Sequence, residues 1–414
     1  LQKKSENGGW ERQINGISNN EKAVLLLEKR TFKELLVDME LRNLQNNIVG
    51  QEASRLFARA EINMGVEAFR DSLYSLLKRN TFLNIKFENM LDTLGEISRT
   101  DIRSLLGEWE KTTPLPFYSL GEPTLTKITN KGGEEFFVLK MLISNNSDYD
   151  GIIHMDIRKD GWWYQPLEDP RAKTKIEMPA HTSKEFVSVW EDQIRNVEIN
   201  TMVSGNLPNI ISQDINNVKQ ERNKIVKDSI YILPESSFDL PGEIIVDNED
   251  STLFILSAPP IVGLLPKWLD EVEETPFKYS GISWWRPPLQ WTATTNDRYY
   301  GKYIRSAFVI KSGDGSQTAT WKVPVPEVGQ YDLYYHVFKD DELRWNNNLQ
   351  GEYHFKVKYG SEVEDAYVNL RKANEGWEQL GSYYFDSDTV RVVLTDECKL
   401  RSVTADAVKI VKRY

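Results

Sequence analysis

The chain has 414 residues, of which 40% are hydrophobic and 27% charged, and its formal net charge is -11. The length predicts roughly two to four domains rather than one. The acidic balance repels a phosphate backbone and no basic face offsets it, so the composition argues against a nucleic-acid partner. No apolar run reaches the ~18 residues of a membrane-spanning helix, so we predict no transmembrane segment in this chain.

The cysteine count and the first residue are relevant to whether the protein is exported and whether the chain is processed. Cys398 is the single cysteine, so it can form no internal disulfide and has no partners for a cysteine-based metal site. This pattern suits an exported bacterial protein and a cytosolic one equally well. The chain begins with Leu1 rather than Met and shows no signal-like apolar region, so we expect a processed chain or a piece cut from a longer protein.

The first part of the chain carries a helical pattern. After a polar, Gly- and Asn-rich lead-in over residues 1–20, apolar residues recur at helical spacing up to Pro114 and Pro116, which cannot continue a helix. We therefore predict an α-helical segment over residues 1–113. Its predicted helices begin near Phe32, Ala53, Val66, Phe87 and Ile102.

The middle of the chain carries a strand pattern. From about residue 120 to 215 the hydrophobic period becomes two, and Gly-, Asn- and Pro-containing turns separate the apolar runs. About six short strands in such a length are typical of an immunoglobulin-like β-sandwich. Residues 209–229 have a helical pattern, and we predict a linker helix there. The predicted domain covers residues 114–229.

A second β-rich region follows over residues 230–414, without an internal repeat. Its clearest stretch is Gln317–Phe338, where two apolar strands flank a Pro-Glu-Val-Gly turn. Alternate residues from Tyr331 to Val337 share one face, which is the period of a strand. We predict a β-hairpin here.

No catalytic motif stands out. The sequence has no HExxH or HxH zinc motif, no GxSxG nucleophile elbow, and no P-loop or dinucleotide fingerprint. The Ser312–Gly315 piece is typical of a turn. An enzyme site assembled from distant Asp, Glu and Tyr residues is a separate class, and nothing in the spacing favours it. The histidines are scattered, at His154, His181, His336 and His354.

Two acidic features have a structural and a functional interpretation. Asp247 and Asp250 lie in an acidic cluster after a strand and could ligate Ca²⁺ through oxygens, although a solvated turn is the favoured alternative. Asp406 lies inside an apolar strand pattern. We expect it to accept structural hydrogen bonds from a neighbouring loop rather than to act as an acid.

The aromatic stretch Ser283–Tyr303 is the best candidate recognition surface. Flat rings stack on sugar rings, and the flanking polar groups can fix hydroxyls. Packing at the end of a core is the favoured alternative, and a protein partner is a third. The candidate ligand-binding residues are Trp284, Trp285, Trp291, Tyr299 and Tyr300, with Trp345 on a separate loop.

One resemblance lies in the helical segment. The Gly-x-Glu-Ala-Phe-Arg run at residues 65–70, followed by Ser98, Asp101, Leu105 and Trp109, resembles the final helices of the catalytic domain of aminopeptidase-N-like gluzincin peptidases. The next sandwich resembles the β-domain that follows in some membrane-associated bacterial relatives. The family's HExxH and its downstream Glu ligand are absent, so the resemblance transfers no catalytic residue. It implies a catalytic part upstream or one that was lost.

A second resemblance lies in the C-terminal region. The residues that carry it are Trp321, Pro326, Gly329, Tyr331, Trp377, Leu380, Gly381, Tyr383, Phe385, Val403, Ala405, Asp406, Ala407 and Val408. In these residues the region is similar to the golvesin C-terminal/xanthan lyase carbohydrate-binding-like domain. The resemblance implies a jelly-roll-like β-sandwich and a glycan or cell-surface ligand.

Together these patterns predict a multidomain α plus β chain: a helical segment over 1–113, an immunoglobulin-like sandwich over 114–229 and a golvesin-like sandwich over 230–414. The resemblances imply the non-catalytic C-terminal portion of a bacterial exported or membrane-associated aminopeptidase-like protein, located outside the cytoplasm in the periplasm, at the cell surface or in the medium. The alternative is a structural module that packs on a missing upstream catalytic domain.

Overall fold

The computed structural model describes most of the chain in two compact units. Residues Asn19–Phe238 form one, here called the helical–sandwich unit, and Leu1–Ser18 together with Asp239–Tyr414 form the other, the C-terminal unit. Strands outnumber helices in the described residues. These residues are 14–413 except 82, 100, 107–110, 160–164, 223–225, 235–241, 258–276, 284–285 and 340–350.

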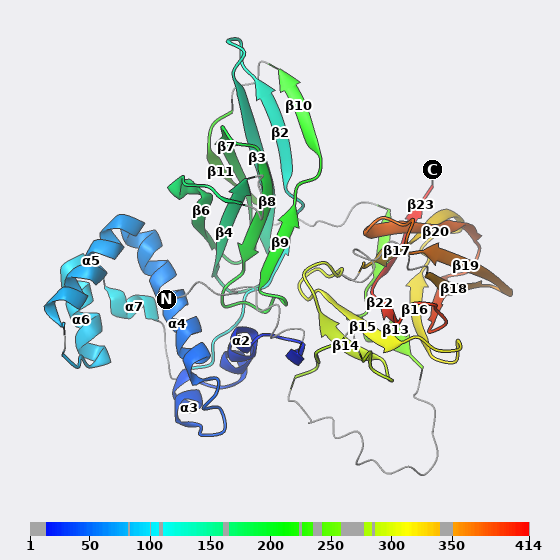
Figure 1. The fold of residues 1–414 in the computed structure, drawn as a ribbon, viewed down its shortest axis with the longest axis horizontal. Helices are drawn as coiled ribbons and strands as arrows, with labels where there is room; N and C mark the ends of the chain where they lie inside the picture. The colour runs from blue at the N-terminus through cyan, green and yellow to red at the C-terminus, as the bar shows by residue number, and fades with distance from the viewer. Residues whose placement is uncertain are drawn as a thin grey trace. The chain divides into compact units, whose positions relative to one another are not determined.

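The helical segment has the predicted helices and one more. Neighbouring helices such as α5 and α6 pack side by side (Figure 1), burying Leu56, Phe69 and Leu91 between them. The additional helix, α2, begins inside the stretch that we expected to be a loose lead-in. The helices are α2 (Asn19–Lys29), α3 (Phe32–Val37), α4 (Gln45–Met64), α5 (Val66–Arg79), α6 (Phe87–Ser98) and α7 (Ile102–Leu106).

Two sheets make the sandwich of the helical–sandwich unit. One has the strand order β10-β2-β3-β7-β11 with β1 on β3, and the other β5-β4-β8-β9 with β6 on β4. Leu139 on β3, Met155 on β4 and Val197 on β8 meet in the core between them. The strands are β1 (Tyr118–Leu120), β2 (Thr124–Thr129), β3 (Glu135–Asn145), β4 (Gly151–Lys159), β5 (Gln165–Pro166), β6 (Lys173–Met178), β7 (Thr182–Trp190), β8 (Ile194–Asn200), β9 (Ile210–Asp214), β10 (Val218–Arg222) and β11 (Ser229–Pro234).

The predicted linker helix over residues 209–229 is wrong. The described part of this stretch forms β9 and β10 and leads into β11. Ile210 and Ile211 are buried on β9, which pairs with β8, and β10 runs parallel to β2. Pairing with strands that are distant in sequence overrides the local helical pattern, because helix propensity is only a weak preference.

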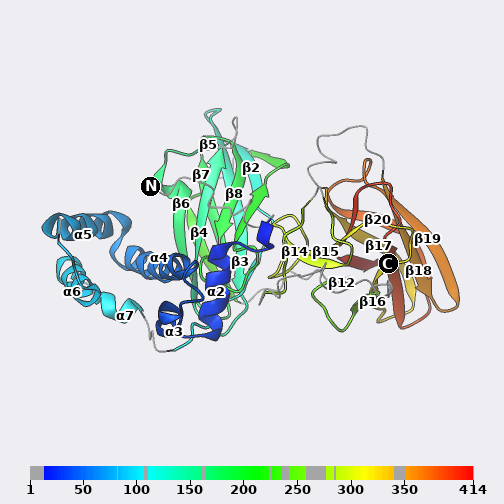
Figure 2. The same ribbon diagram turned by 60° about the horizontal axis from the view of Figure 1, so that its bottom comes forward.

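Helix α4 packs on the sandwich beside β4 and β6 (Figure 2), where Glu61 forms an ion pair with Lys175. A cavity of about 30 Å³ lies at this junction, lined by Arg55, Arg59 and Asp150 among others. Such a volume is enough for one water molecule. The helices and the first sandwich therefore share one compact unit.

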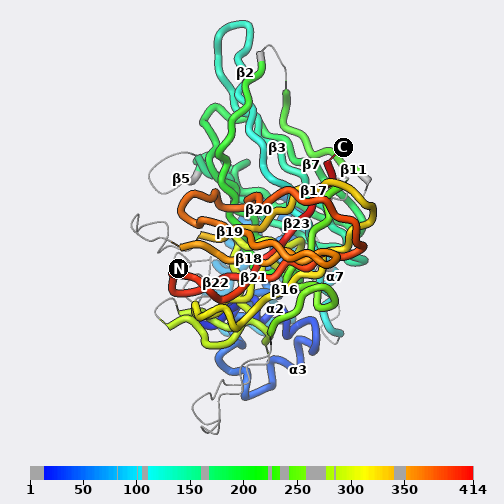
Figure 3. Tube along the Cα trace, turned by 90° about the vertical axis from the view of Figure 1, so that its right-hand side faces the viewer, coloured from blue at the N-terminus to red at the C-terminus, as the bar shows by residue number. Residues whose placement is uncertain are grey.

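The C-terminal unit holds three sheets around one core. Their strand orders are β12-β23-β17-β20, β13-β16-β21-β18-β19 and β14-β15-β22. Figure 3 shows β17, β20 and β23 in one layer and β16, β18 and β21 in the next. The strands are β12 (Glu243–Val246), β13 (Phe254–Leu256), β14 (Thr292–Thr295), β15 (Ser306–Lys311), β16 (Thr318–Pro324), β17 (Gly329–Val337), β18 (Glu352–Tyr359), β19 (Glu362–Asn369), β20 (Gly376–Phe385), β21 (Thr389–Thr395), β22 (Ser402–Ala405) and β23 (Val408–Lys412).

The predicted hairpin at Gln317–Phe338 is wrong, although both of its strands exist. Strand β16 pairs with β13 and β21, whereas β17 pairs with β20 and β23, so the Pro-Glu-Val-Gly turn carries the chain from one sheet to the other. The Tyr331 hydroxyl donates to the backbone oxygen of Glu327 at 2.8 Å. This is the geometry of a tyrosine corner, which fixes such crossovers in β-sandwiches.

Residues 14–18 belong to the C-terminal unit, far from its other residues in sequence. Ile17 is 0% exposed, and the Thr295 hydroxyl donates to the backbone oxygen of Gly16 at 2.7 Å. Gly16 has a φ of +80°, and a Cβ there would lie 2.5 Å from backbone atoms of Ser280. This part of the expected loose lead-in is therefore a packed segment in which only glycine fits at position 16.

Across the ranges that the structure describes, no helix is both long enough and apolar enough to cross a membrane.

Candidate functional site

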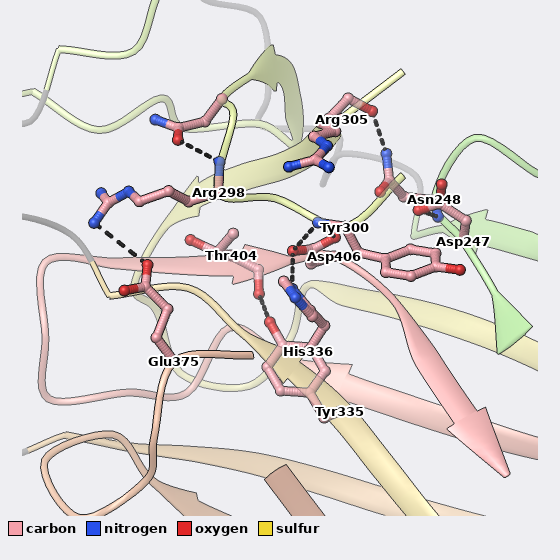
Figure 4. A network of polar contacts seen from close by, with 12 residues as sticks. Asp247, Asn248, Arg298, Tyr300, Arg305, Tyr335, His336, Glu375, Thr404 and Asp406 are labelled. Carbon is pink, nitrogen blue, oxygen red and sulfur yellow. Dashed lines mark hydrogen bonds and ion pairs between the residues drawn. The ribbon is translucent and has the colours of Figure 1, made fainter. Parts of the chain in front are cut away.

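Asp406 is the central side chain of a polar network in the C-terminal unit. It follows β22 and is 0% exposed. Its carboxylate accepts the backbone N–H of Tyr300, 3.2 Å from each oxygen, and lies 2.8 Å from Nδ1 of His336 (Figure 4). The Trp321 indole donates to the Asp406 backbone oxygen at 3.2 Å. The prediction that Asp406 accepts structural hydrogen bonds from a neighbouring loop is confirmed.

His336 receives a fixed orientation from this carboxylate. It lies on β17, where Tyr335 and Val337 point into the core, so its own side chain lies on the opposite, outer face of the sheet. In the neutral tautomer whose Nδ1 donates to Asp406, Nε2 is a hydrogen-bond acceptor. Nε2 has no hydrogen-bond partner among the described residues, and the side chain is 13% exposed.

Two aromatic rings surround His336. The ring centroid of Trp377, its partner across the β17–β20 ladder, lies 5.1 Å from the imidazole. The ring of Tyr300 lies 5.8 Å from His336 and 5.1 Å from Trp377. Lys409 on β23 places Nζ 4.9 Å from the Trp377 centroid. We call Tyr300, His336, Trp377 and Lys409 the outer-face cluster.

The loop that carries Tyr300 also holds a second contact group. Arg298 lies over the Phe338 ring at 4.6 Å and forms an ion pair with Glu375 at 3.3 Å (Figure 4). The buried Tyr299 ring packs on Phe338 with its centroid 4.6 Å away. These contacts hold the loop against the end of β17 next to the outer-face cluster.

A second buried carboxyl lies near Asp406. Burial raises the pKa of Asp247 well above its ordinary value, and the charge of Asp406 adds to this rise. Burial also raises the pKa of Asp406, while His336 opposes the rise by pairing with the charged form. Next to Asp247, Glu249 accepts the hydroxyl of Tyr279 at 3.0 Å. The charges that oppose these rises come from His336 and Arg305 at Asp406 and from Lys278 at Asp247.

The structure places three of the predicted ligand-binding residues. Tyr300 lies in the outer-face cluster, Tyr299 is buried beside it, and Trp291 is half-buried against the core of the C-terminal unit. Trp291 is not brought together with the other two in any ring contact of the described residues. The remaining three, Trp284, Trp285 and Trp345, lie outside the described residues. A ligand-binding role for all six stays a prediction.

Among the described residues, the surroundings of Asp247 and Asp250 offer no additional ligands that would support a Ca²⁺ site. Asp250 accepts the hydroxyl and the backbone N–H of Thr252 with one oxygen, and Asp247 accepts the backbone N–H of Asn248. Within the described ranges, no three His, Cys, Asp or Glu side chains gather so as to hold a metal ion.

Sequence reasoning missed His336, Trp377 and Lys409 as a group. The period-two pattern of β17 already puts His336 on the face opposite Tyr331 and Tyr335. No local signal pairs it with Trp377, however, because the two residues are on strands joined only through a long connection. The ladder register between β17 and β20 is what brings the rings together.

The fold and site therefore define a β-sandwich with a histidine and aromatic cluster on the outer face of one sheet. Residues 287–412 match the family model of the golvesin C-terminal domain. This match spans β14 to β23 and all four residues of the outer-face cluster. It confirms the resemblance predicted for the C-terminal region. No curated protein matches the chain.

Several solved structures are similar to parts of the chain. The Paenibacillus xanthan lyase is 16% identical over 73% of this chain and 27% of its own, with a TM-score of 0.30. The Bacteroides uniformis beta-glucuronidase is 12% identical over 77% of this chain and 32% of its own, with a TM-score of 0.22. Legionella pneumophila aminopeptidase A is 17% identical over 30% of this chain and 14% of its own, with a TM-score of 0.15. The chain thus spans a third or less of each, and at these scores the likeness does not define its fold.

Proposed function

We propose that the C-terminal unit is a carbohydrate-binding module and that the outer-face cluster is its contact surface. The observation that carries the proposal is the imidazole nitrogen Nε2 of His336, which lacks a hydrogen-bond partner among the described residues and stands beside the rings of Tyr300 and Trp377. Aromatic rings pack on the C–H faces of sugars, and a few fixed polar groups then select hydroxyl positions.

The chemistry of the cluster suits a sugar hydroxyl. Asp406 holds the His336 ring in one orientation, so a ligand does not have to immobilise it, which lowers the entropic cost of binding. The Lys409 ammonium adds a hydrogen-bond donor near Trp377. Its Nζ also forms an ion pair with Oε1 of Glu243 at 3.0 Å. The match of residues 287–412 to the golvesin C-terminal domain supports the same class of ligand.

We propose further that the chain is the C-terminal portion of an exported or membrane-associated bacterial protein with an aminopeptidase-like part upstream, and that the module attaches it to a glycan outside the cytoplasm. The support is the Gly65–Arg70 run and the residues that follow it in the helical segment. The alternative is that the unit only packs on that upstream part. Sequencing the gene upstream of Leu1 separates the proposals for the parent, since an HExxH motif with a downstream Glu supports a peptidase.

The first test is binding of the whole chain to polysaccharides. Native gels that contain xanthan, or another soluble bacterial polysaccharide, retard a chain that binds the polymer. We expect retardation of the wild-type chain and at least about 10-fold weaker binding by Trp377→Ala, because hot-spot rings carry most of such an interaction.

Tyr384→Ala is the matched control, since Tyr384 is an exposed ring on the same strand and lies outside the cluster. Thermal unfolding of each variant checks that the fold survives. Equal retardation of Trp377→Ala and wild type, or no retardation in any polysaccharide, contradicts the proposal.

A further inference from the structure

The packed N-terminal segment, residues 14–18, lies on the strand that leads into the Tyr300 loop. The hydroxyl of Thr295, the last residue of β14, donates to the Gly16 backbone oxygen. Gly16 also lies against the backbone of Ser280, whose N–H in turn donates to the Ala293 oxygen on β14 at 2.8 Å. One side of β14 is therefore covered by Ser280 and the N-terminal segment.

The other side of β14 pairs with β15 alone, so this strand is at the edge of its sheet. The Tyr300 loop begins directly after Thr295 and closes where the Asn296 N–H donates to the Arg305 oxygen at 3.1 Å. Between these ends, the Tyr300 N–H reaches Asp406. The position of Tyr300 in the outer-face cluster thus depends on how firmly the end of β14 is held.

We propose that residues 14–18 act as an intramolecular clamp that positions the Tyr300 loop, so that docking of this segment and ligand binding at the outer-face cluster are coupled. The ligand-binding half of this inference rests on the proposed function; the clamp does not. Coupling of this kind is reciprocal, so each event strengthens the other.

Loss of the segment has a defined physical consequence. Thr295 is 3% exposed with the segment in place, and without the segment its hydroxyl would lose its acceptor, the Gly16 oxygen. A strand held on one side only opens more often, and the loop that it carries opens with it.

Amide hydrogen exchange of the whole chain tests the clamp without any ligand. Gly16→Val cannot keep the φ of +80° or the 2.5 Å approach to Ser280, so it releases the segment. We expect exchange of the Tyr300 amide to rise about 10-fold or more, with amides of β8 unchanged. Thr295→Val removes only the hydroxyl contact and keeps the fold, and we expect a smaller rise at Tyr300.

Asn15→Ala is the matched control, because Asn15 is an exposed residue of the same segment and its change leaves the Gly16 contacts intact. A Tyr300 amide that exchanges at the wild-type rate in both Gly16→Val and Thr295→Val overturns the clamp. Weaker retardation of Gly16→Val than of wild type in a xanthan gel supports the coupling. Unretarded wild-type chain in that gel contradicts the proposed function, and the exchange result then decides the clamp on its own.

Discussion

Asp247 and Asp406 are two buried carboxyl groups that influence each other, and only Asp406 has an imidazole partner. The folded state raises the pKa of Asp247, so the folded chain binds this proton more tightly than the unfolded chain does. Stability from such a group is fully present below the ordinary pKa of an aspartate, near 3.8, and is lost as the pH rises through the raised value. Asp247 therefore weakens the C-terminal unit at neutral pH.

Asp247→Asn should raise the thermal unfolding midpoint at pH 7. Asparagine is neutral at every pH, and its side-chain oxygen can still accept the Asn248 N–H. We expect a rise of about 2–4 °C at pH 7, the effect of ~1 kcal/mol in a unit of this size, and a smaller rise at pH 4. Unfolding curves of wild type and variant from pH 4 to 8 measure this difference.

Asp250→Asn is the matched comparison with the opposite sign. The hydroxyl and backbone N–H of Thr252 lower the pKa of Asp250, so this carboxylate stabilises the fold above its ordinary pKa and loses that contribution as the pH falls. We expect Asp250→Asn to lower the midpoint at pH 7. A fall for Asp247→Asn at pH 7 would count against the buried acid pair.

The crossover between β16 and β17 shows what a hydroxyl contributes at the scale of an element. Pro326 and Gly329 shape a turn that changes sheets, and Tyr331 bonds back to Glu327 at its base. The Tyr331 ring also stacks on Phe385 with centroids 5.7 Å apart. The ring of Tyr331 therefore packs in the core, while its hydroxyl makes a hydrogen bond in the turn.

Tyr331→Phe separates the contribution of the hydroxyl from that of the ring. It keeps the ring in the core and removes only the bond to the Glu327 oxygen. We expect a loss of about 1 kcal/mol in the free energy of unfolding, the usual net value of one hydrogen bond. Chemical denaturation of the whole chain measures the loss, with Tyr384→Phe as an exposed control. If Tyr331→Phe lost no more unfolding free energy than Tyr384→Phe, the tyrosine corner would not stabilise the crossover.

The sequence predicted the two strands of Gln317–Phe338 but not their partners. The alternation from Tyr331 to Val337 follows from burial on one face, which a strand shows whichever sheet contains it. Whether β16 and β17 pair with each other depends on strands more distant along the chain, so the hairpin was wrong. The hydrogen bonds of Asp406 were predictable, because a lone acid in an apolar stretch needs local donors, although Asp406 lies between β22 and β23 rather than in a strand. His336 was not, because its neighbours come from β20, β23 and the Tyr300 loop.

At the scale of the whole molecule, the chain enters the C-terminal unit twice. Residues up to Ser18 belong to it, the helical–sandwich unit follows, and the chain returns before β12. No sequence pattern predicts this arrangement, since Gly16 and Thr295 meet across 279 residues. The division into 1–113, 114–229 and 230–414 stays a prediction, and the contacts group the first two segments together.

Two units with separate cores should unfold in two calorimetric transitions. Ile17→Asp puts a charge at a position that is 0% exposed and belongs to the C-terminal unit, so we expect it to lower one transition by about 2 kcal/mol or more and to leave the other in place. The control is Ile14→Asp, since Ile14 is 70% exposed in the same segment. If Ile17→Asp shifted neither transition, the segment would not be part of the C-terminal unit.

The place of Gly16 and Ile17 also sets an order of events on the ribosome. Both residues are synthesised before the whole helical–sandwich unit, yet Thr295, which bonds to Gly16, follows it by 279 residues. At about 5–20 residues per second, this gap lasts roughly 15–60 s. Throughout that time Gly16 lacks both of its neighbours, Ser280 and Thr295, so the segment is not yet held in place. The helical–sandwich unit can fold first, and the C-terminal unit closes only when β14 has emerged.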